Sequence, residues 1–453
     1  FYSAYFALDV TVPTSPKLLW SFSRSDLGLA TSVPAVVRVN PGADVKTSNT
    51  NAKWFMVVGS GPTGYGATVS QSAKLFVVNL ATGSLATTFS VGSWNSFIGD
   101  MTSFDKNLDY RHDAVYFGRV IDDGSLPWRG KIYRLTMGPG RVAGSPVPFG
   151  EETNPAQWGI LSGGNRVPTE MLDTFLSGAE MGPVADAPGV TLDDAANVWV
   201  FAGSGRYYGG ADKTDTSTQY FVGMKDSVML ASSSCDQTVS TVNCWENDLV
   251  DVSNATVCVV GVGDCGQASG TNQLTGVTGV STFSGLIGLV QSKDGWVTKL
   301  LEPANPPGQP VPYGIGERVV NSPTVFGGIV FFPTFIPTSD ICQSSGTSRL
   351  WALFYKTGSA YQEPIIGTSA SGANQVVNRF GSLGQGLAFG VVVHIGSGRD
   401  GSSPFGLFIN TSQGNFADCP TCGPGGPGTP PSSSIGANVA IEPRSHYLSW
   451  INM

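Results

Sequence analysis

The sequence predicts an all-β protein, a β-propeller of about six to seven four-stranded blades. Two observations support this prediction. Apolar residues come in short runs between many turn residues, and the ends of several expected strands resemble one another. Helical periodicity is scarce along the chain. Short strands joined by frequent turns are typical of such folds, and each part of the repeat can be justified in order.

The composition is typical of a strand-and-turn protein. Only 13% of the 453 residues are charged, whereas ordinary soluble domains contain about 25%. The chain holds 59 Gly and 29 Pro, and its 41% hydrophobic residues suffice for a sizeable core. A net charge of −8 without a basic cluster argues against nucleic acid as a partner. No apolar run approaches the 18 or so residues of a membrane span.

Three strand ends carry the repeat, and each finishes in Gly-Ser-Gly: WFMVVGSGP at 54–62, VWVFAGSGR at 198–206 and VVVHIGSGR at 391–399. A phosphate loop would need a helix after the glycines, and a GxSxG nucleophile elbow would need a partner His. Neither is evident, so we interpret these strings as a turn that each blade requires. Ala-Thr-Gly and Lys-Thr-Gly turns close expected hairpins at 81–83 and 356–358.

The repeat divides the chain into expected blades at 32–92, 98–148, 181–300, 316–367 and 380–415. The opening YFALDVTVPTSPKLLWSFS supplies only the last two strands of a further blade. An incomplete first blade exposes a sheet edge, so we expect either upstream residues or the segment 435–450 to pair with it. The chain starts at Phe1 in strand-like sequence with no initiator Met, so we expect it to be part of a longer precursor, in which a removed signal peptide would leave no trace here.

These boundaries give a propeller over 1–417, a Gly/Pro/Ser-rich loop over 418–434, and a closing strand segment over 435–453. Within the propeller, residues 226–275 form a Ser/Thr/Gly-rich insertion that we expect to protrude from the rim or from one face. The insertion contains four of the seven cysteines: Cys235, Cys244, Cys258 and Cys265.

Cysteine usage favours disulfides in an exported protein. We expect bridges within the insertion in one of three pairings, and a small bridge between Cys419 and Cys422. Cys342 is then free or pairs outside the chain. A zinc site is the alternative, but the spacings form no two CxxC pairs and only three His are present. Haem attachment at 419–422 would require His where Gly423 stands.

The stretch DKNLDYRHD at 105–113 concentrates three carboxylates in nine residues. They would repel one another in a compact loop, so either the loop is splayed into water or a cation lies among them. Oxygens at positions 1, 3, 5 and 9, with a carbonyl at position 7, can surround one Ca²⁺ at about 2.3–2.6 Å. From the residues alone, a solvated turn and a calcium loop both stay open. Asp212 and Asp215 could similarly hold an ion, although a solvated Asx turn is favoured.

Several long segments resemble the C-terminal propeller domain of the PilY family, proteins associated with the tips of bacterial type IV pili. They are YFALDVTVPTSPKLLW at 5–20, SFDKNLDYRHDAVYFG at 103–118, GSGRYYGGADKTDTSTQYFVGMKD at 203–226, and GERVVNSPTVFGGIVFFPTFIPTSDICQSSGTSRLWALFYKTG at 316–358. The resemblance implies a non-enzymatic protein of pilus biogenesis and surface adhesion that is exported to the cell surface and pilus tip (fimbrium), with outer-membrane association as a further option. It implies minor pilins or the pilus tip as partners, together with a surface or host ligand.

The resemblance also implies a calcium loop on one blade. The side chains of Asp105, Asn107, Asp109 and Asp113 would be ligands, together with the carbonyl of Arg111. Two features depart from the family: Arg119 stands where an acidic residue is frequent, and Gly398-Arg399-Asp400 is not an integrin-type Arg-Gly-Asp motif.

A propeller enzyme of the quinoprotein dehydrogenase type is the alternative function, since such enzymes share blade-like strands and calcium. They typically place an adjacent Cys-Cys pair beneath the quinone, and this sequence contains no such pair. A bound chromophore in the absorbance spectrum would distinguish the two functions.

Overall fold

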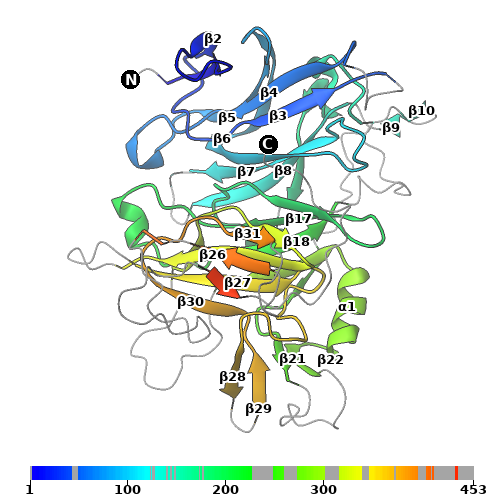
Figure 1. Cartoon of the computed structure of the whole chain (residues 1–453), viewed down its shortest axis with the longest axis vertical. Coiled ribbons are helices and arrows are strands. Elements are labelled where there is room, and N and C mark those ends of the chain that lie inside the picture. Colours follow the sequence, from blue (N-terminus) through cyan, green and yellow to red (C-terminus); the bar gives the residue numbers. More distant parts are fainter. Residues whose placement is uncertain are drawn as a thin grey trace.

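The fold is known from a computed structural model and is built almost entirely of strands (Figure 1). The one α-helix among the described residues is α1 (Phe283–Gln291), and three short 3₁₀ helices accompany it: η1 (Tyr65–Ala67), η2 (Pro155–Gln157) and η3 (Gly210–Lys213). The prediction of an all-β, propeller-like fold is confirmed. The structure describes residues 3–42, 49–122, 124, 128–138, 141–142, 145–146, 149–172, 174–175, 178–226, 248–259, 273–300, 316–338, 346–371, 374–395, 405–409, 411–412 and 434–436.

The first two full blades share one seven-stranded sheet in the order β13-β8-β7-β6-β5-β4-β3. The long strand β6 joins them, because its first half pairs with β5 and its second half pairs with β7. Every neighbouring pair in this sheet is antiparallel. The strands are β3 (Ala35–Val39), β4 (Lys53–Gly59), β5 (Ser72–Asn79), β6 (Leu85–Phe104), β7 (Ala114–Ile121), β8 (Arg129–Thr136) and β13 (Thr169–Leu172).

Two further sheets form the next blades. The third blade has the order β16-β17-β18-β23, with β19 added in parallel at its edge. Its strands are β16 (Gly189–Leu192), β17 (Val198–Gly203), β18 (Tyr220–Lys225), β19 (Leu249–Asp251) and β23 (Gly295–Lys299). The fourth blade has the order β24-β26-β27-β30, and β25 also pairs with β26. Its strands are β24 (Arg318–Val319), β25 (Thr324–Phe326), β26 (Ile329–Ile336), β27 (Thr347–Phe354) and β30 (Phe380–Gln385).

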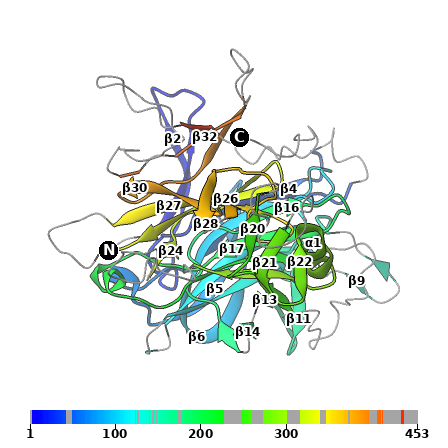
Figure 2. The same cartoon turned by 90° about the horizontal axis from the view of Figure 1, so that it is seen from below.

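Smaller sheets complete the described structure, and Figure 2 shows them around the blades. One five-stranded sheet has the order β22-β21-β20-β29-β28, and a three-stranded sheet has the order β31-β32-β33. Pairs of strands make up the rest: β1 with β2, β9 with β10, β11 with β12, and β14 with β15. The bounds are β1 (Tyr5–Asp9), β2 (Lys17–Phe22), β9 (Arg141–Val142), β10 (Ser145–Pro146), β11 (Ile160–Ser162), β12 (Asn165–Val167), β14 (Thr174–Phe175), β15 (Ala179–Glu180), β20 (Thr256–Cys258), β21 (Gln273–Val277), β22 (Val280–Thr282), β28 (Thr368–Ser371), β29 (Asn374–Val377), β31 (Val392–Ile395), β32 (Phe405–Phe408) and β33 (Ser434–Gly436).

Two blade limits differ from the sequence prediction. The second blade takes its fourth strand from β13, beyond the expected end at residue 148. The fourth blade takes β30, which the sequence assigned to a separate blade at 380–415. Both strands are short and contain polar residues or glycine, so they lack the continuous apolar run that marks a buried strand. The described part of the expected insertion contains β19, β20 and the start of β21.

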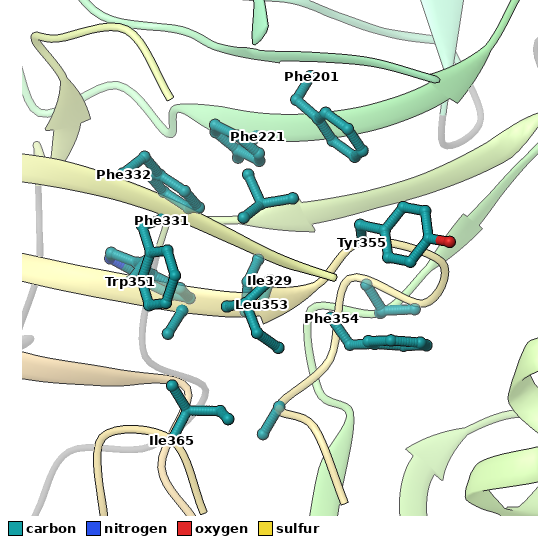
Figure 3. Close-up of a cluster of buried hydrophobic side chains, with 14 of the residues drawn as sticks. Phe201, Phe221, Ile329, Phe331, Phe332, Trp351, Leu353, Phe354, Tyr355 and Ile365 are labelled. Carbon is teal, nitrogen blue, oxygen red and sulfur yellow. The ribbon is translucent and has the colours of Figure 1, made fainter. Parts of the chain in front are cut away.

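Aromatic side chains fill the core between the third and fourth blades (Figure 3). The rings of Phe221 and Phe332 stack with centroids 3.7 Å apart, and Trp351 stacks on Phe332 at 5.8 Å. Each such side chain stabilises the fold by about 1.5–3 kcal/mol when fully buried. Because these residues come from β18, β26 and β27, they fix the two blades against each other.

The two described Gly-Ser-Gly strings, at 59–61 and 203–205, lie at the ends of β4 and β17 and have a structural role; the third string, at 396–398, lies outside the described residues. In the first blade the buried Ser60 accepts the Lys74 N–H at its Oγ (2.9 Å), and in the third blade Ser204 accepts the Tyr220 N–H (2.8 Å). The carbonyl of Ser60 accepts the Ile98 N–H of the following blade, and that of Ser204 accepts the Val319 N–H. The repeated string therefore connects each of these blades to the next one.

The Thr-Gly turns are a second contact between blades. Gly83 has φ +70° and Gly358 has φ +65°, in the left-handed region that favours glycine. A Cβ on Gly83 would lie 2.6 Å from the Trp20 ring, and a Cβ on Gly358 would lie 2.2 Å from the Trp296 ring. Each indole N–H also donates to a turn carbonyl at 2.8 Å, Trp20 to Leu80 and Trp296 to Tyr355.

Candidate functional site

The acidic loop, residues 105–113, connects β6 to β7 at one end of the second blade. Its end is fixed by the first blade: the Arg38 N–H donates to His112 Nδ1 (3.0 Å), and the His112 N–H donates to the Arg38 carbonyl (2.9 Å). The Asp113 N–H donates to the Phe104 carbonyl at 2.8 Å, which closes the base of the loop. These hydrogen bonds therefore anchor the C-terminal end and the base of the loop to the neighbouring strands.

Inside the loop, two residues take left-handed backbone conformations, Leu108 with φ 55° and Tyr110 with φ 68°. Such angles are uncommon outside glycine and fold the chain tightly. As a result, the carboxylate of Asp105 accepts the N–H groups of Asp109 (3.2 Å) and Tyr110 (2.8 Å). The carboxylate of Asp113 reaches back to the Lys106 N–H at 2.7 Å. The loop is folded on itself and is not splayed into water.

The predicted ligands Asn107 and Asp109 lie beside each other. The Asn107 side-chain amide donates to Asp109 Oδ2 at 3.1 Å, and its Oδ1 accepts the Asp109 N–H at 3.2 Å. Asn107 is exposed, whereas Asp105 and Asp109 are half-buried and Asp113 is buried. The structure thus brings the four predicted side chains into one small loop.

Sequence reasoning missed one role in this loop, that of the Arg111 side chain. Its guanidinium pairs with Asp109 Oδ2 at 2.8 Å and with Glu151 Oε1 at 2.6 Å. From the sequence, only the backbone carbonyl of Arg111 was expected to take part in the site. An arginine two residues after an aspartate in a tight turn was the available signal, but Glu151 is distant in the sequence and gave none.

The electrostatics of the loop favour a cation. Burial raises the pKa of Asp113 from its ordinary 3.8 to about 7, and the charges of Asp105 and Asp109 add to this effect. Burial also raises the pKa of Asp105, with a smaller contribution from Asp109. Arg111 offsets the charge of Asp109, whereas at Asp113 the charge of Lys106 lowers the pKa less than burial raises it.

The residues present fit a calcium ion in type and charge. Ca²⁺ takes six to eight oxygen ligands, and carboxylates, an amide oxygen and a backbone carbonyl are its usual donors. In the present arrangement, Asp109 is engaged by Arg111, and no three acidic, His or Cys side chains of the described residues already surround one point. Glu151 already shares the guanidinium, so it could retain Arg111 when Asp109 turns toward an ion.

The second acidic segment is different. Asp212 is buried, and its carboxylate pairs with Arg206 Nε at 2.7 Å while also accepting the N–H groups of Tyr208 and Gly209, both at 2.8 Å. The Arg206 guanidinium lies over the Trp128 ring at 3.7 Å. Asp215 accepts the Ser217 N–H at 2.9 Å, which is the Asx turn that the sequence favoured. An internal cation already balances Asp212.

The other predicted features fall mostly outside the described residues. Of the seven cysteines, only Cys258 is described; it lies on β20 and is buried. The pairings proposed for Cys235, Cys244, Cys265, Cys342, Cys419 and Cys422 therefore stay predictions. Arg119, which departs from the family pattern, is buried and donates to Ser96 Oγ at 2.8 Å and to the Trp94 carbonyl at 3.3 Å. No described helix is long and apolar enough to cross a membrane.

Comparison with known proteins gives a consistent result. The chain is 24% identical over 383 residues to a type IV pilus biogenesis factor PilY1 homolog of Xylella fastidiosa, a match that covers 78% of this chain and 21% of that protein. It is 30% identical over 138 residues to the type IV pilus biogenesis factor PilY1 of Pseudomonas aeruginosa, covering 29% of this chain and 10% of that protein. The chain thus spans about a fifth or less of the length of these relatives. No protein-family model matches it.

The fold has a relative among solved structures. The crystal structure of the Pseudomonas aeruginosa PilY1 C-terminal domain superimposes with a TM-score of 0.59 at 18% sequence identity. The superposition covers 91% of this chain and 77% of that domain. The structural likeness therefore extends over nearly all of the chain and supports the propeller-like fold.

Proposed function

We propose that this chain, which belongs to the PilY family as its C-terminal domain, acts in type IV pilus biogenesis and surface adhesion as a calcium-binding module. The names of the matched relatives support the pilus assignment. The acidic loop supports calcium, because it combines oxygen ligands with buried carboxylates whose pKa values are raised. The protein would be exported and would lie at the cell surface and pilus tip, with minor pilins as partners.

Calcium would be held by the side chains of Asp105, Asn107, Asp109 and Asp113 and by the carbonyl of Arg111. Three carboxylates in a flexible ring of many oxygens favour Ca²⁺ over the smaller Mg²⁺. A bound ion would remove the repulsion within the loop and stabilise the end of the second blade by mass action. Because the loop is tied to β3 through Arg38 and His112, calcium would also stabilise the contact between the first two blades. We therefore expect a mechanical or regulatory role.

The test is a complementation experiment in the source bacterium. A strain without this gene would receive the wild-type gene, an Asp109→Ala variant or an Asp215→Ala variant as the matched control. We expect surface pili and adherent cells to return with the wild type and the control, and to fall several-fold with Asp109→Ala. Imaging of the labelled protein should place it on pili; a purely periplasmic location would contradict the proposal.

A quinoprotein-type enzyme is the second candidate, since its propeller also uses calcium. No specific feature of the described residues favours it over the pilus function. An absorbance spectrum of the purified protein distinguishes them, because a bound quinone or haem would produce bands in the visible range. Such bands would overturn the purely adhesive function.

A further inference from the structure

The hairpin of β1 and β2 carries an unusual apolar surface. Its outward side exposes Phe6 (62%), Leu8 and Leu18 (63%), and Leu8 lies opposite Leu18 in the register. Leu19 (61%) stands at the bulge of the hairpin, and Val10 and Val12 of the turn are also exposed. Soluble monomers rarely leave such a contiguous apolar face in water, so the face is expected to be covered by another element.

The other face of the hairpin is part of the core. Trp20 and Phe22 of β2 are buried against Met56, Val58, Phe76 and Val78 of the first full blade. The hairpin is therefore packed firmly on one side and uncovered on the other. Figure 1 places β2 and the N-terminus at one end of the molecule, beyond the first blade.

The strands β18 and β23 of the third blade correspond to β1 and β2 of the hairpin. Trp20 of β2 and Trp296 of β23 make the same contact with the blade that follows: each ring covers the glycine of a Thr-Gly turn, and each indole N–H donates to the carbonyl three residues before that glycine. Thus β2 occupies the position of β23, and β1 occupies that of β18. In the third blade, the free side of β18 pairs with β17, and β17 pairs with β16. In the part of the chain that the structure describes, β1 pairs only with β2.

We propose that β1 and β2 are the outer half of a four-stranded blade, and that a pair of antiparallel strands from PilY-type polypeptide outside residues 1–453 completes it. The inner strand of that pair would hydrogen-bond to the free edge of β1, as β17 does to β18. It would be apolar on both faces, because β17 is buried along its whole length. The relatives contain enough chain to supply this pair, since the matched region covers only 21% of the Xylella protein and 77% of the solved C-terminal domain.

The test is hydroxyl-radical footprinting of Phe6, Leu18 and Leu19, read by mass spectrometry. It compares the 453-residue chain with the longest polypeptide that its gene encodes, each in calcium and at several concentrations. Tyr65 (75% exposed) and Trp94 (55% exposed) serve as controls on other elements. We expect Phe6, Leu18 and Leu19 to be modified several-fold less in the longer polypeptide, while Tyr65 and Trp94 stay equally reactive.

Three results would overturn the proposal. Equal modification of Phe6 in both polypeptides, or a gene that encodes no further strand pair, would mean that nothing outside the chain covers the hairpin. Protection in the 453-residue chain that rises with concentration would identify a second copy as the occupant. Protection in this chain that disappears when 437–453 are deleted would identify its own C-terminal segment. The readout is independent of calcium binding at residues 105–113, so its failure would not affect the proposed function.

Discussion

Two acidic segments of this molecule differ in how the negative charge of their buried carboxylates is balanced. In the paired turn, residues 206–215, the buried Asp212 has Arg206 as an internal counterion and two backbone N–H donors. In the acidic loop, residues 105–113, Arg111 pairs with only one of the three carboxylates, that of Asp109. Burial raises the pKa of Asp113 to about 7, although the charge of Lys106 acts in the opposite direction. The number of acidic residues therefore does not distinguish the two segments. We expect a cation site where buried carboxylates outnumber their internal cations.

Removal of the internal cation should have the largest effect on stability. Arg206→Ala leaves the buried carboxylate of Asp212 without its partner, so we expect a loss of about 3–5 kcal/mol in the free energy of unfolding, measured with urea. The control is Arg24→Ala, which removes a half-exposed partner of Asp26 and should cost about 1 kcal/mol or less. Equal losses in the two variants would contradict the difference between buried and exposed pairs.

The metal-free acidic loop should make stability depend on pH. A carboxyl whose pKa is higher in the folded state binds more protons when folded, so stability falls as pH rises from about 4 to about 7. A shift of this size corresponds to at most about 4 kcal/mol for Asp113, which is buried. Unfolding measured across this range should show the fall in wild type without metal. The fall should be smaller in Asp113→Asn or with calcium, and the part that remains belongs to groups such as Asp186, whose pKa burial also raises to about 7. An unchanged slope in Asp113→Asn would assign the fall to other groups.

Arg111 tests whether an internal cation competes with calcium. Arg111→Gln keeps the backbone carbonyl but removes the charge that holds Asp109 Oδ2 at 2.8 Å. Calorimetric titration should therefore show calcium affinity higher by roughly 1 kcal/mol than in wild type. Arg166→Gln, whose guanidinium donates to the Gly159 carbonyl, is the control with unchanged affinity. A lower affinity in Arg111→Gln would show that Arg111 positions Asp109 as a ligand.

The smallest effect is expected at the rim of the paired turn. Asp215→Ala removes the hydrogen bond to the Ser217 N–H and should cost about 0.5–1 kcal/mol. Calcium affinity should stay unchanged, because this aspartate belongs to an Asx turn. A drop in affinity would mean that calcium also binds at residues 212–215, which would erase the contrast between the two segments.

Much of the fold could be predicted from the sequence, because its signals are local. Gly-Ser-Gly and Thr-Gly turns recur at strand ends, and buried strands such as β17 are continuous apolar runs. The partners of β13 and β30 were not predictable, since short polar or glycine-containing strands depend on their neighbours for pairing. The continuity of β6 across two blades was not predicted, because Gly92 and Ser93 between its halves favour a break in the strand.

The clustering of the candidate side chains could be predicted from the sequence, whereas the balance of charge around them could not. The four side chains lie within nine consecutive residues, 105–113, so a tight loop brings them close together. Glu151, which shares the Arg111 guanidinium, and Arg38, which donates to the Tyr110 carbonyl at 2.6 Å, come from distant parts of the chain. Only the folded structure shows that these contacts leave Asp113 buried among like charges.

The central claim is that the acidic loop binds Ca²⁺, and calorimetric titration of the metal-free protein tests it most directly. Wild type and Asp215→Ala should bind one calcium ion in this loop with equal affinity, whereas Asp109→Ala should bind it more than about tenfold more weakly, a loss of ~1.4 kcal/mol. Protection of the loop amides from hydrogen exchange on calcium addition would place the ion at residues 105–113. Equal affinity in wild type and Asp109→Ala, or no binding in either, would contradict the account.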